Sequence, residues 1–238
     1  MGIVCLECLA QLTSQLKGRV YIRRQGRMTH AQARALKTLL ERYHVAMSAS
    51  PEDWPSRFGR EAPLLLEVGF GMGHALLATA QLHPEWNCIG VEVYRPGIGA
   101  LLNGIADAEL ENVRVIEGDA RDVLANMFAE GTLRRVAVFF PDPWPKSKHH
   151  KRRLINAEFA VLVASRLVRG GDLQVATDWE HYAQSMRSVL DAERGLENIA
   201  GPGQFASRND ERPTTRFEAR GVRLGHQVWD LAYRRVQL

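Results

Sequence analysis

The sequence predicts an α/β fold with a mostly parallel sheet and helices on both faces. From residue 64 onward, short apolar segments alternate with helix-forming segments. These apolar segments lack polar alternation, which is typical of parallel strands buried on both faces. A glycine-rich segment directly follows the first of them, at 69–73. Only the last segment, 227–236, alternates, so we expect one antiparallel strand there, near the C-terminal edge of the sheet.

The chain of 238 residues suits one large domain, at 61–238, preceded by an extension, at 1–60. Residues 17–28 are rich in arginine and are expected to form a basic arm. A helix follows, because Thr29 and Gln32 have the spacing of a capping box and apolar residues then recur at helical intervals. Prolines and a glycine predict a loop before the main domain.

Within the main domain, breaks in the pattern separate the elements. The first helix stops at Pro84, and Gly170 and Gly171 are expected to end the fourth. Continuous short apolar runs favour strands between the helices. The strands are expected at 64–68, 88–91, 113–116, 136–140, 173–176 and 227–236, and the helices at 75–82, 97–106, 123–129, 156–168 and 179–190.

Composition argues against several classes of protein. No apolar run reaches membrane-spanning length, and the N-terminus lacks the basic start and the cleavage site of a secretion signal. Cys5 and Cys8 form a CxxC pair, but His149 and His150, the candidates for a second ligand pair, are adjacent and far away in the sequence, so we expect no metal. The low cysteine content fits a cytoplasmic protein, and we expect no membrane partner.

The net charge is only +4, from 31 basic and 27 acidic residues, but the basic residues are clustered. Basic clusters suggest a polyanionic partner, although any single one is equally consistent with a solubilising surface. The three clusters are Arg19, Arg23, Arg24, Arg27, Arg34 and Lys37; then residues 146–153; then Arg208, Arg212, Arg216, Arg220 and Arg223.

The glycine-rich segment has Gly69, Gly71 and Gly73 between a strand and a helix. Glycines there permit a tight turn and close approach of the backbone to a ligand. A dinucleotide fingerprint would have its third glycine where His74 stands. Glu67 would repel a pyrophosphate but suit an ammonium group. This favours S-adenosylmethionine, which carries an ammonium and a cationic sulfur.

Carboxylates also follow the later strands. Glu92 ends the second strand, where an acid can accept hydrogen bonds from ribose hydroxyls. Asp119 follows the third and is placed to meet an adenine amino group, while Asp142 and Asp178 follow the next two. Carboxylates that converge at one sheet edge repel each other, which indicates a cationic or hydroxyl-bearing ligand. A generic nucleotide-binding sheet is the alternative.

The segment 141–145 fixes Asp142 between two prolines, which restrict the backbone on both sides. We expect this carboxylate to be held at the catalytic edge of the sheet. Trp144 could stack on a flat base, and Lys146 and the basic run after it could pair with phosphates. Packing of the tryptophan and a solvated basic surface are the alternatives.

With these motifs in place, the sequence resembles the bacterial tRNA (guanine-N7)-methyltransferases, which are class I methyltransferases with a Rossmann-like sheet. The resemblance covers about residues 18–238. The matching motifs are RRQGRMT at 23–29, LEVGFGMG at 66–73, GVE at 90–92, EGDA at 117–120, FPDPWPK at 140–146, HHKRR at 149–153, ATDW at 176–179 and TRFE at 215–218. Arg216 departs from the family's usual lysine, and residues 1–16 match no part of it.

The resemblance implies methyl transfer from S-adenosyl-L-methionine to N7 of a variable-loop guanine, position 46, in tRNA. It implies that Glu67, Glu92 and Asp119 bind the cofactor and that Asp142 both contacts the cofactor and acts in catalysis. It also implies a set of positions that bind the substrate or its RNA backbone: Lys146, Lys148, Lys151, Arg152, Arg153, Asp178, Thr215, Arg216, Phe217 and Glu218.

Guanine N7 carries an in-plane lone pair and loses no proton when it is methylated by in-line displacement. Catalysis is therefore expected to depend on positioning and electrostatics, with Asp142 orienting the guanine and stabilising its developing charge. The alternatives are a methyltransferase that acts on a small molecule or protein and a noncatalytic RNA-binding module. We expect a monomer, with a homodimer as the second possibility.

Overall fold

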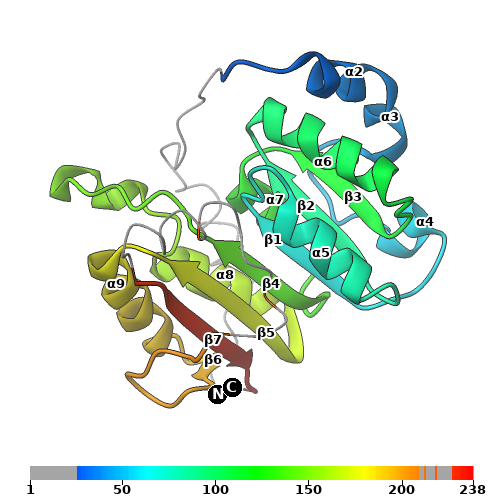
Figure 1. The fold of residues 1–238 in the computed structure, drawn as a ribbon. Coiled ribbons are helices and arrows are strands. Elements are labelled where there is room, and N and C mark those ends of the chain that lie inside the picture. The colour runs from blue at the N-terminus through cyan, green and yellow to red at the C-terminus, as the bar shows by residue number, and fades with distance from the viewer. Residues whose placement is uncertain (1–25, 209–211, 213–217, 219–226, 238) are drawn as a thin grey trace.

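The computed structural model describes residues 26–208, 212, 218 and 227–237. Figure 1 shows the arrangement of the elements. The helices are α2 (His30–Thr38), α3 (Leu40–Tyr43), α4 (Trp54–Phe58), α5 (His74–Leu82), α6 (Arg95–Asp107), α7 (Ala120–Met127), the 3-10 helix η1 (Ser147–Arg152), α8 (Ala157–Arg166) and α9 (Glu180–Asp191). The strands are β1 (Leu64–Val68), β2 (Asn87–Glu92), β3 (Val113–Glu117), β4 (Leu133–Phe139), β5 (Leu167–Thr177), β6 (Leu196–Asn198) and β7 (Trp229–Arg235).

The seven strands form one sheet in the order β3-β2-β1-β4-β5-β7-β6. Strands β1 to β5 pair in parallel, and β7 runs antiparallel to both β5 and β6. The prediction of a mostly parallel sheet with one antiparallel strand near the C-terminal edge is therefore confirmed. The strand order reverses between β1 and β4, and this switch point is where ligands of such sheets bind.

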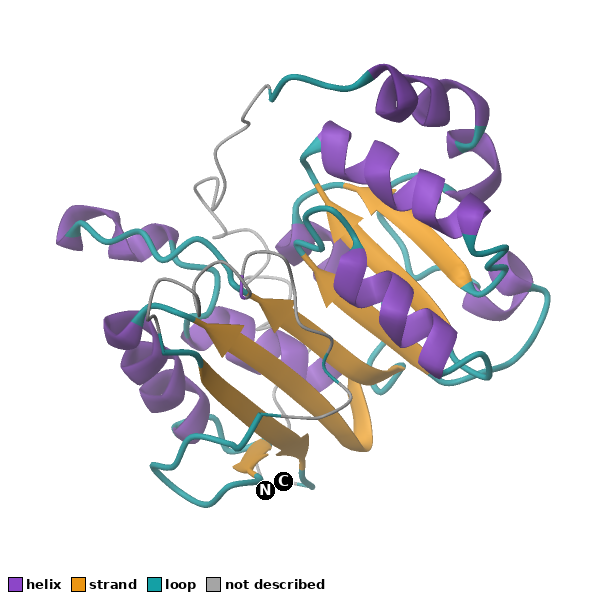
Figure 2. Cartoon of the chain, in the orientation of Figure 1, coloured by secondary structure: helices purple, strands orange, loops and turns teal. Residues whose placement is uncertain are grey.

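Helices cover both faces of the sheet, as Figure 2 shows. On β1, Leu66 and Val68 belong to one buried cluster, which includes residues of α7, α8 and α9, whereas Leu65 belongs to the other, which includes residues of α2, α5 and α6. Successive strand side chains point to opposite faces, so β1 is buried on both. This explains the continuous apolar runs in the sequence.

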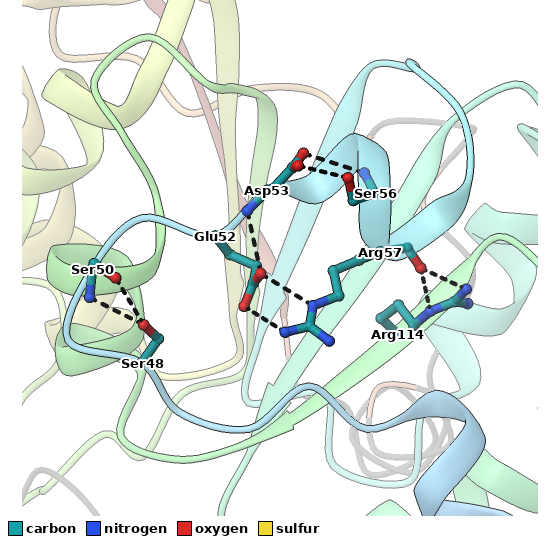
Figure 3. Close-up of polar contacts among 7 residues, drawn as sticks. All are labelled: Ser48, Ser50, Glu52, Asp53, Ser56, Arg57 and Arg114. Atoms are coloured by element: carbon teal, nitrogen blue, oxygen red, sulfur yellow. Dashed lines mark hydrogen bonds and ion pairs between the residues drawn. The ribbon is translucent and has the colours of Figure 1, made fainter.

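The described part of the extension packs on the main domain. The capping box at Thr29 and Gln32 is confirmed and begins α2, which lies along α6. Trp54 of α4 stacks on Phe128, with ring centroids 4.8 Å apart. Figure 3 shows polar contacts within the segment from Ser48 to Arg57, and Arg114 of β3 donates to the backbone carbonyl of Arg57 in α4. The domain boundary at residue 60 stays a prediction.

The predicted end of the fourth helix is wrong. Helix α8 stops at Arg166, and β5 begins at the next residue. Gly170 and Gly171 lie inside β5, where the pairing with β4 shifts register. A Cβ on Gly171 would meet three backbone carbonyl oxygens at 2.9–3.1 Å, so this irregularity in the ladder requires glycine.

Other differences are small or concern elements that the sequence analysis missed. Helix α7 begins three residues earlier than predicted because Asp119 caps it, and it ends at Met127. Strand β4 ends at Phe139 because Phe140 is left-handed, with φ 53°. The short elements α4, η1 and β6 were not predicted. Within the described residues, no helix has the length and apolar character needed to span a membrane.

Candidate active site

The predicted site residues gather at the carboxyl ends of the parallel strands. The glycine loop at 69–73 follows β1, and the proline-rich turn at 141–145 follows β4, its neighbour across the switch point. Glu67 lies one residue before the end of β1, opposite Gly90 on β2 and Ala137 on β4. The fold therefore places the glycine loop and the proline-rich turn on adjacent strands.

The three loop glycines are needed for conformation. Gly69, Gly71 and Gly73 have φ values of 68°, 57° and 81°, which side chains other than glycine rarely adopt. Gly97, in the first turn of α6, packs so closely on the loop that an added Cβ would overlap the carbonyl oxygen of Gly71. The loop is thus held between β1 and the N-terminal turn of α6.

Glu92 connects the end of β2 to this loop. Its Oε2 accepts from the Gly71 amide at 2.9 Å, and its Oε1 accepts from the amides of Val93 and Tyr94 at 2.7 and 3.0 Å. Burial raises the pKa of the Glu92 carboxyl above its ordinary value, against the lowering effect of these amides, and the negative charge of Asp142 raises it further. Two predicted site residues, one at the end of β2 and one in the turn after β4, therefore interact electrostatically.

Glu67 is the most deeply buried acid of the site, with 3% of its surface exposed. Burial, together with the charge of Glu92, raises the pKa of the Glu67 carboxyl from 4.5 to about 8. A cation between these two carboxyls would relieve both the desolvation and the repulsion. The pair therefore suits an ammonium or sulfonium ligand, as the sequence predicts.

Asp119 has a structural role that its motif did not indicate. Its Oδ1 accepts from the Arg121 amide at 3.0 Å and so caps α7. The contact with an adenine amino group stays a prediction. Met47, from the loop before α4, lies against Gly118, the residue before Asp119. A Cβ added to Gly118 would be 2.7 Å from the Met47 sulfur. No sequence motif indicated Met47.

The turn after β4 exposes Asp142 and buries Trp144. Trp144 is 8% exposed, and the guanidinium of Arg152 lies 4.9 Å from its ring centroid. The structure therefore corrects the suggestion that Trp144 stacks on a base, since packing occupies its ring. At the same sheet edge, Trp179 precedes α9 and is 42% exposed.

The basic run after the turn divides into exposed and buried members. Lys146, Lys148, Lys151 and Arg152 are exposed on or beside η1. Arg153 is only 4% exposed: it donates to the Pro143 carbonyl at 2.9 Å, and its guanidinium lies 4.7 Å from the Tyr182 ring centroid. The expected phosphate contact of Arg153 is therefore corrected to a role in holding the turn.

Of the predicted C-terminal substrate positions, the described residues include Asp178 and Glu218. Asp178 directly follows β5 and is half-buried. Glu218 is buried and pairs with Arg212 through two 2.7 Å contacts, which corrects its expected exposure to substrate. Thr215, Arg216 and Phe217 lie outside the described residues, as do Cys5, Cys8 and most of the basic arm.

Metal binding has no structural support in the part of the chain that the structure describes. No group of three or more His, Cys, Asp or Glu side chains there is arranged to hold a metal ion. The arrangement instead combines buried carboxyls, a glycine loop, an exposed aspartate and an exposed basic helix. These are groups that can hold a cationic ligand beside a polyanion.

Comparison with known proteins gives a consistent result. The family model described as "Putative methyltransferase" matches residues 61–231. The chain is 52% identical over 217 residues to a tRNA (guanine-N(7)-)-methyltransferase of Thiobacillus denitrificans, covering 91% of this chain and 95% of that protein. The corresponding protein of Hydrogenovibrio crunogenus is 50% identical over 216 residues, covering 91% and 90%.

Solved structures agree on the fold. A point mutant of the 16S rRNA (adenine(1408)-N(1))-methyltransferase from Catenulisporales acidiphilia, solved with its cosubstrate SAM, superposes with a TM-score of 0.52 at 17% identity. The match covers 80% of this chain and 93% of that one. The Rossmann-like class I methyltransferase sheet expected from the sequence is confirmed.

Proposed function

The chain belongs to the tRNA (guanine-N7)-methyltransferase family, and on this premise we propose how its site works and which guanine it modifies. The protein transfers a methyl group from S-adenosyl-L-methionine to N7 of a guanine in tRNA. We place that guanine at position 46, in the variable loop. The observation that supports this most directly is the pair of the buried Glu67 and the half-buried Glu92 behind a glycine loop, beside the exposed Asp142.

The position is testable with two tRNA transcripts that differ only in having guanine or adenine at position 46. Radiolabelled methyl groups should enter the guanine transcript and not the adenine transcript. Equal incorporation into both would place the target elsewhere. Labelling of protein in place of tRNA would favour the alternative class of methyltransferase. A monomeric state and a cytoplasmic location stay predictions, and sedimentation of the purified protein tests the former.

The residues of the site fit S-adenosylmethionine, which when bound supplies a methyl group on a cationic sulfur. In the absence of a cation, burial and the charge of Glu92 disfavour the carboxylate form of Glu67, and a bound cation would favour it. The loop backbone bends at Gly69 and Gly71, which have no side chains, so a ligand can approach the backbone closely there. We assign the carboxylate of Glu92 to the ribose hydroxyls and Asp119 to the adenine.

Cofactor binding should release a proton from Glu67. With a pKa of about 8, this carboxyl is mostly protonated at pH 7, whereas a bound cation favours its carboxylate form. Isothermal titration at pH 7 in two buffers of different ionisation enthalpy should show release of up to about one proton. The affinity should rise as the pH is raised from 6 towards 8.

Glu67→Gln is the matched variant, because glutamine keeps the size and loses the titration. It should bind the cofactor more weakly and release no proton. The folded pKa of Glu67 lies above its ordinary value of 4.5, so its stabilising contribution is complete below pH 4.5 and is lost as the pH rises through about 8. The unliganded variant should therefore gain in melting temperature relative to wild type at high pH. An unchanged proton release would contradict this role.

The guanine needs orientation more than a general base, because N7 has no proton to lose. Asp142 is exposed two residues beyond the left-handed Phe140, where its carboxylate can face a ligand at the switch point. A carboxylate there can accept from the N1 and exocyclic amine of guanine and stabilise the positive charge that the ring acquires. Asp178, after the neighbouring strand β5, is the second candidate for this edge.

The exposed lysines of η1 should contribute to tRNA affinity through phosphate contacts. Lys148→Ala with Lys151→Ala should weaken tRNA binding and lower the magnitude of the slope of log K against log salt by about 1.5. Neither lysine is buried, so the melting temperature should not change. Binding titrations at several salt concentrations measure the slope.

Arg153→Ala, in the same basic run, is the control for the double lysine variant. It removes the bond to Pro143 and the contact with Tyr182, so it should lower the melting temperature and leave the salt slope close to that of wild type. If the double lysine variant kept the wild-type slope, η1 would not be the phosphate contact. If Arg153→Ala reduced the slope as the lysines do, its structural assignment would be wrong.

A further inference from the structure

A buried ion cluster lies beside the turn that carries Asp142. Arg212 is 3% exposed and forms two 2.7 Å contacts with the carboxylate of Glu218. Its Nε also donates to Oδ1 of Asp230 at 2.8 Å. One guanidinium thus bridges two buried carboxylates from separate parts of the C-terminal region. Such a planar fork is a geometry that lysine cannot reproduce.

Strand pairing places this cluster at the carboxyl end of β4. Asp230 of β7 pairs with Ala176 of β5, and Ala176 pairs in turn with Phe139, the last residue of β4. The carbonyl of Ala176 accepts from the amide of Phe140 at 2.8 Å. Backbone pairing across three neighbouring strands therefore connects Asp230 to Phe140, the residue before the turn.

Arg212 also contacts the start of the turn directly. Its guanidinium carbon lies 5.7 Å from the ring centroid of Phe139 and 5.8 Å from that of Phe140, within the range of cation–π attraction. The backbone of Phe140 is left-handed, with φ 53°, which is rare for a bulky residue. A conformation of this kind persists only where its surroundings hold it. Arg212 is one of the groups that surround it.

We propose that Arg212 is a positioning residue for methyl transfer, acting through Phe140 on the direction of Asp142, a proposal that rests on the role assigned to Asp142 above. Glu218 and Asp230 fix the guanidinium of Arg212. The guanidinium in turn holds the rings of Phe139 and Phe140, directly before the turn. Glu218 thereby contributes from the interior, by orienting Arg212. The cluster couples the C-terminal region to the catalytic carboxylate without touching substrate.

A merely stabilising ion pair would act differently, and the chain offers a matched control. Arg135 of β4 donates to Asp172 of β5 at 2.7 Å, and its guanidinium lies 5.1 Å from the Trp86 ring centroid. This pair joins β4 and β5 near the end of β4 opposite to Phe139. It also combines a carboxylate contact with a cation–π contact, but it is remote from Asp142.

The test is a double-mutant cycle between Arg212 and Asp142, with single-turnover methylation of tRNA as the readout. Arg212→Met should lower the rate by at least about 30-fold in the wild-type background but by less than about threefold in the Asp142→Ala background. The dissociation constant for S-adenosylmethionine should change by less than about threefold in both, and Arg135→Met should lower the rate by less than about threefold.

Equal effects of Arg212→Met in the two backgrounds would overturn the proposal, as would an equal loss in Arg135→Met. If Arg212→Met does not fold, Arg212→Lys keeps the charge but not the fork and should still lower the rate by at least about fivefold; wild-type turnover in that variant would also overturn it. Wild-type turnover of Asp142→Ala alone would show separately that the role assigned to Asp142 is wrong.

Discussion

Replacing Asp142 with alanine is expected to lower the rate of tRNA methylation by at least about 100-fold, because a preorganised charge at the reacting ring is lost. Cofactor binding should persist, since Glu67, Glu92 and the glycine loop remain in place. The measurement is single-turnover transfer from radiolabelled S-adenosylmethionine, with calorimetry for cofactor affinity.

Asp142→Asn separates charge from shape. Asparagine can still accept one hydrogen bond at the same place, but it carries no negative charge. The rate should therefore be intermediate, above that of the alanine variant and below wild type by at least about tenfold. Near-normal turnover of the alanine variant would remove Asp142 from the mechanism. Lost cofactor binding in either variant would show that the carboxylate acts mainly on the cofactor.

Gly97→Ala is expected to have the second large effect, on cofactor affinity. The added Cβ would overlap the backbone oxygen of Gly71, and backbone cannot move aside as a flexible side chain can. The loop must shift, and with it the amide that donates to Glu92. The dissociation constant for S-adenosylmethionine should rise by at least about tenfold, equal to about 1.4 kcal/mol.

Gly104→Ala is the control on the same helix. The three atoms nearest to its Cβ would all belong to the Leu77 side chain, which can change rotamer. Alanine is also the better helix former, so the variant should fold and bind the cofactor almost as wild type does. Calorimetry and melting curves compare the two variants. Equal cofactor affinity in both would mean that contact between α6 and the loop does not shape the site.

The parts of the fold that the sequence predicted well are those with local signals. Pro84 marks the end of α5, and the capping box marks the start of α2. The end of α8 was wrong because Gly170 and Gly171 serve the register between β4 and β5, which depends on a distant strand. From the sequence alone, a pair of glycines that ends a helix cannot be distinguished from a pair that lies in an irregular strand.

In the site, too, the residues with local sequence signals could be predicted, and those that depend on packing could not. Glu67, Glu92 and Asp142 could be predicted because each follows or ends a parallel strand, and such ends meet at one edge. The burial of Arg153 could not, because its partner Tyr182 comes from α9. Trp144 and Glu218 have partners nearby in the sequence, since the guanidinium of Arg152 lies over the Trp144 ring and Arg212 pairs with Glu218, but the motifs do not show that these side chains pack inward. Motifs identified the residues of this edge, but packing decided which of them face solvent.

Nucleoside mass spectrometry of an unmodified tRNA transcript, after incubation with the protein and S-adenosylmethionine bearing a deuterated methyl group, tests the central claim most directly. We predict 7-methylguanosine carrying the deuterated methyl, absent when Asp142→Ala replaces the wild-type protein over the same time. A methyl group on any other base or atom, or an unmodified transcript with the wild-type protein, would contradict the account.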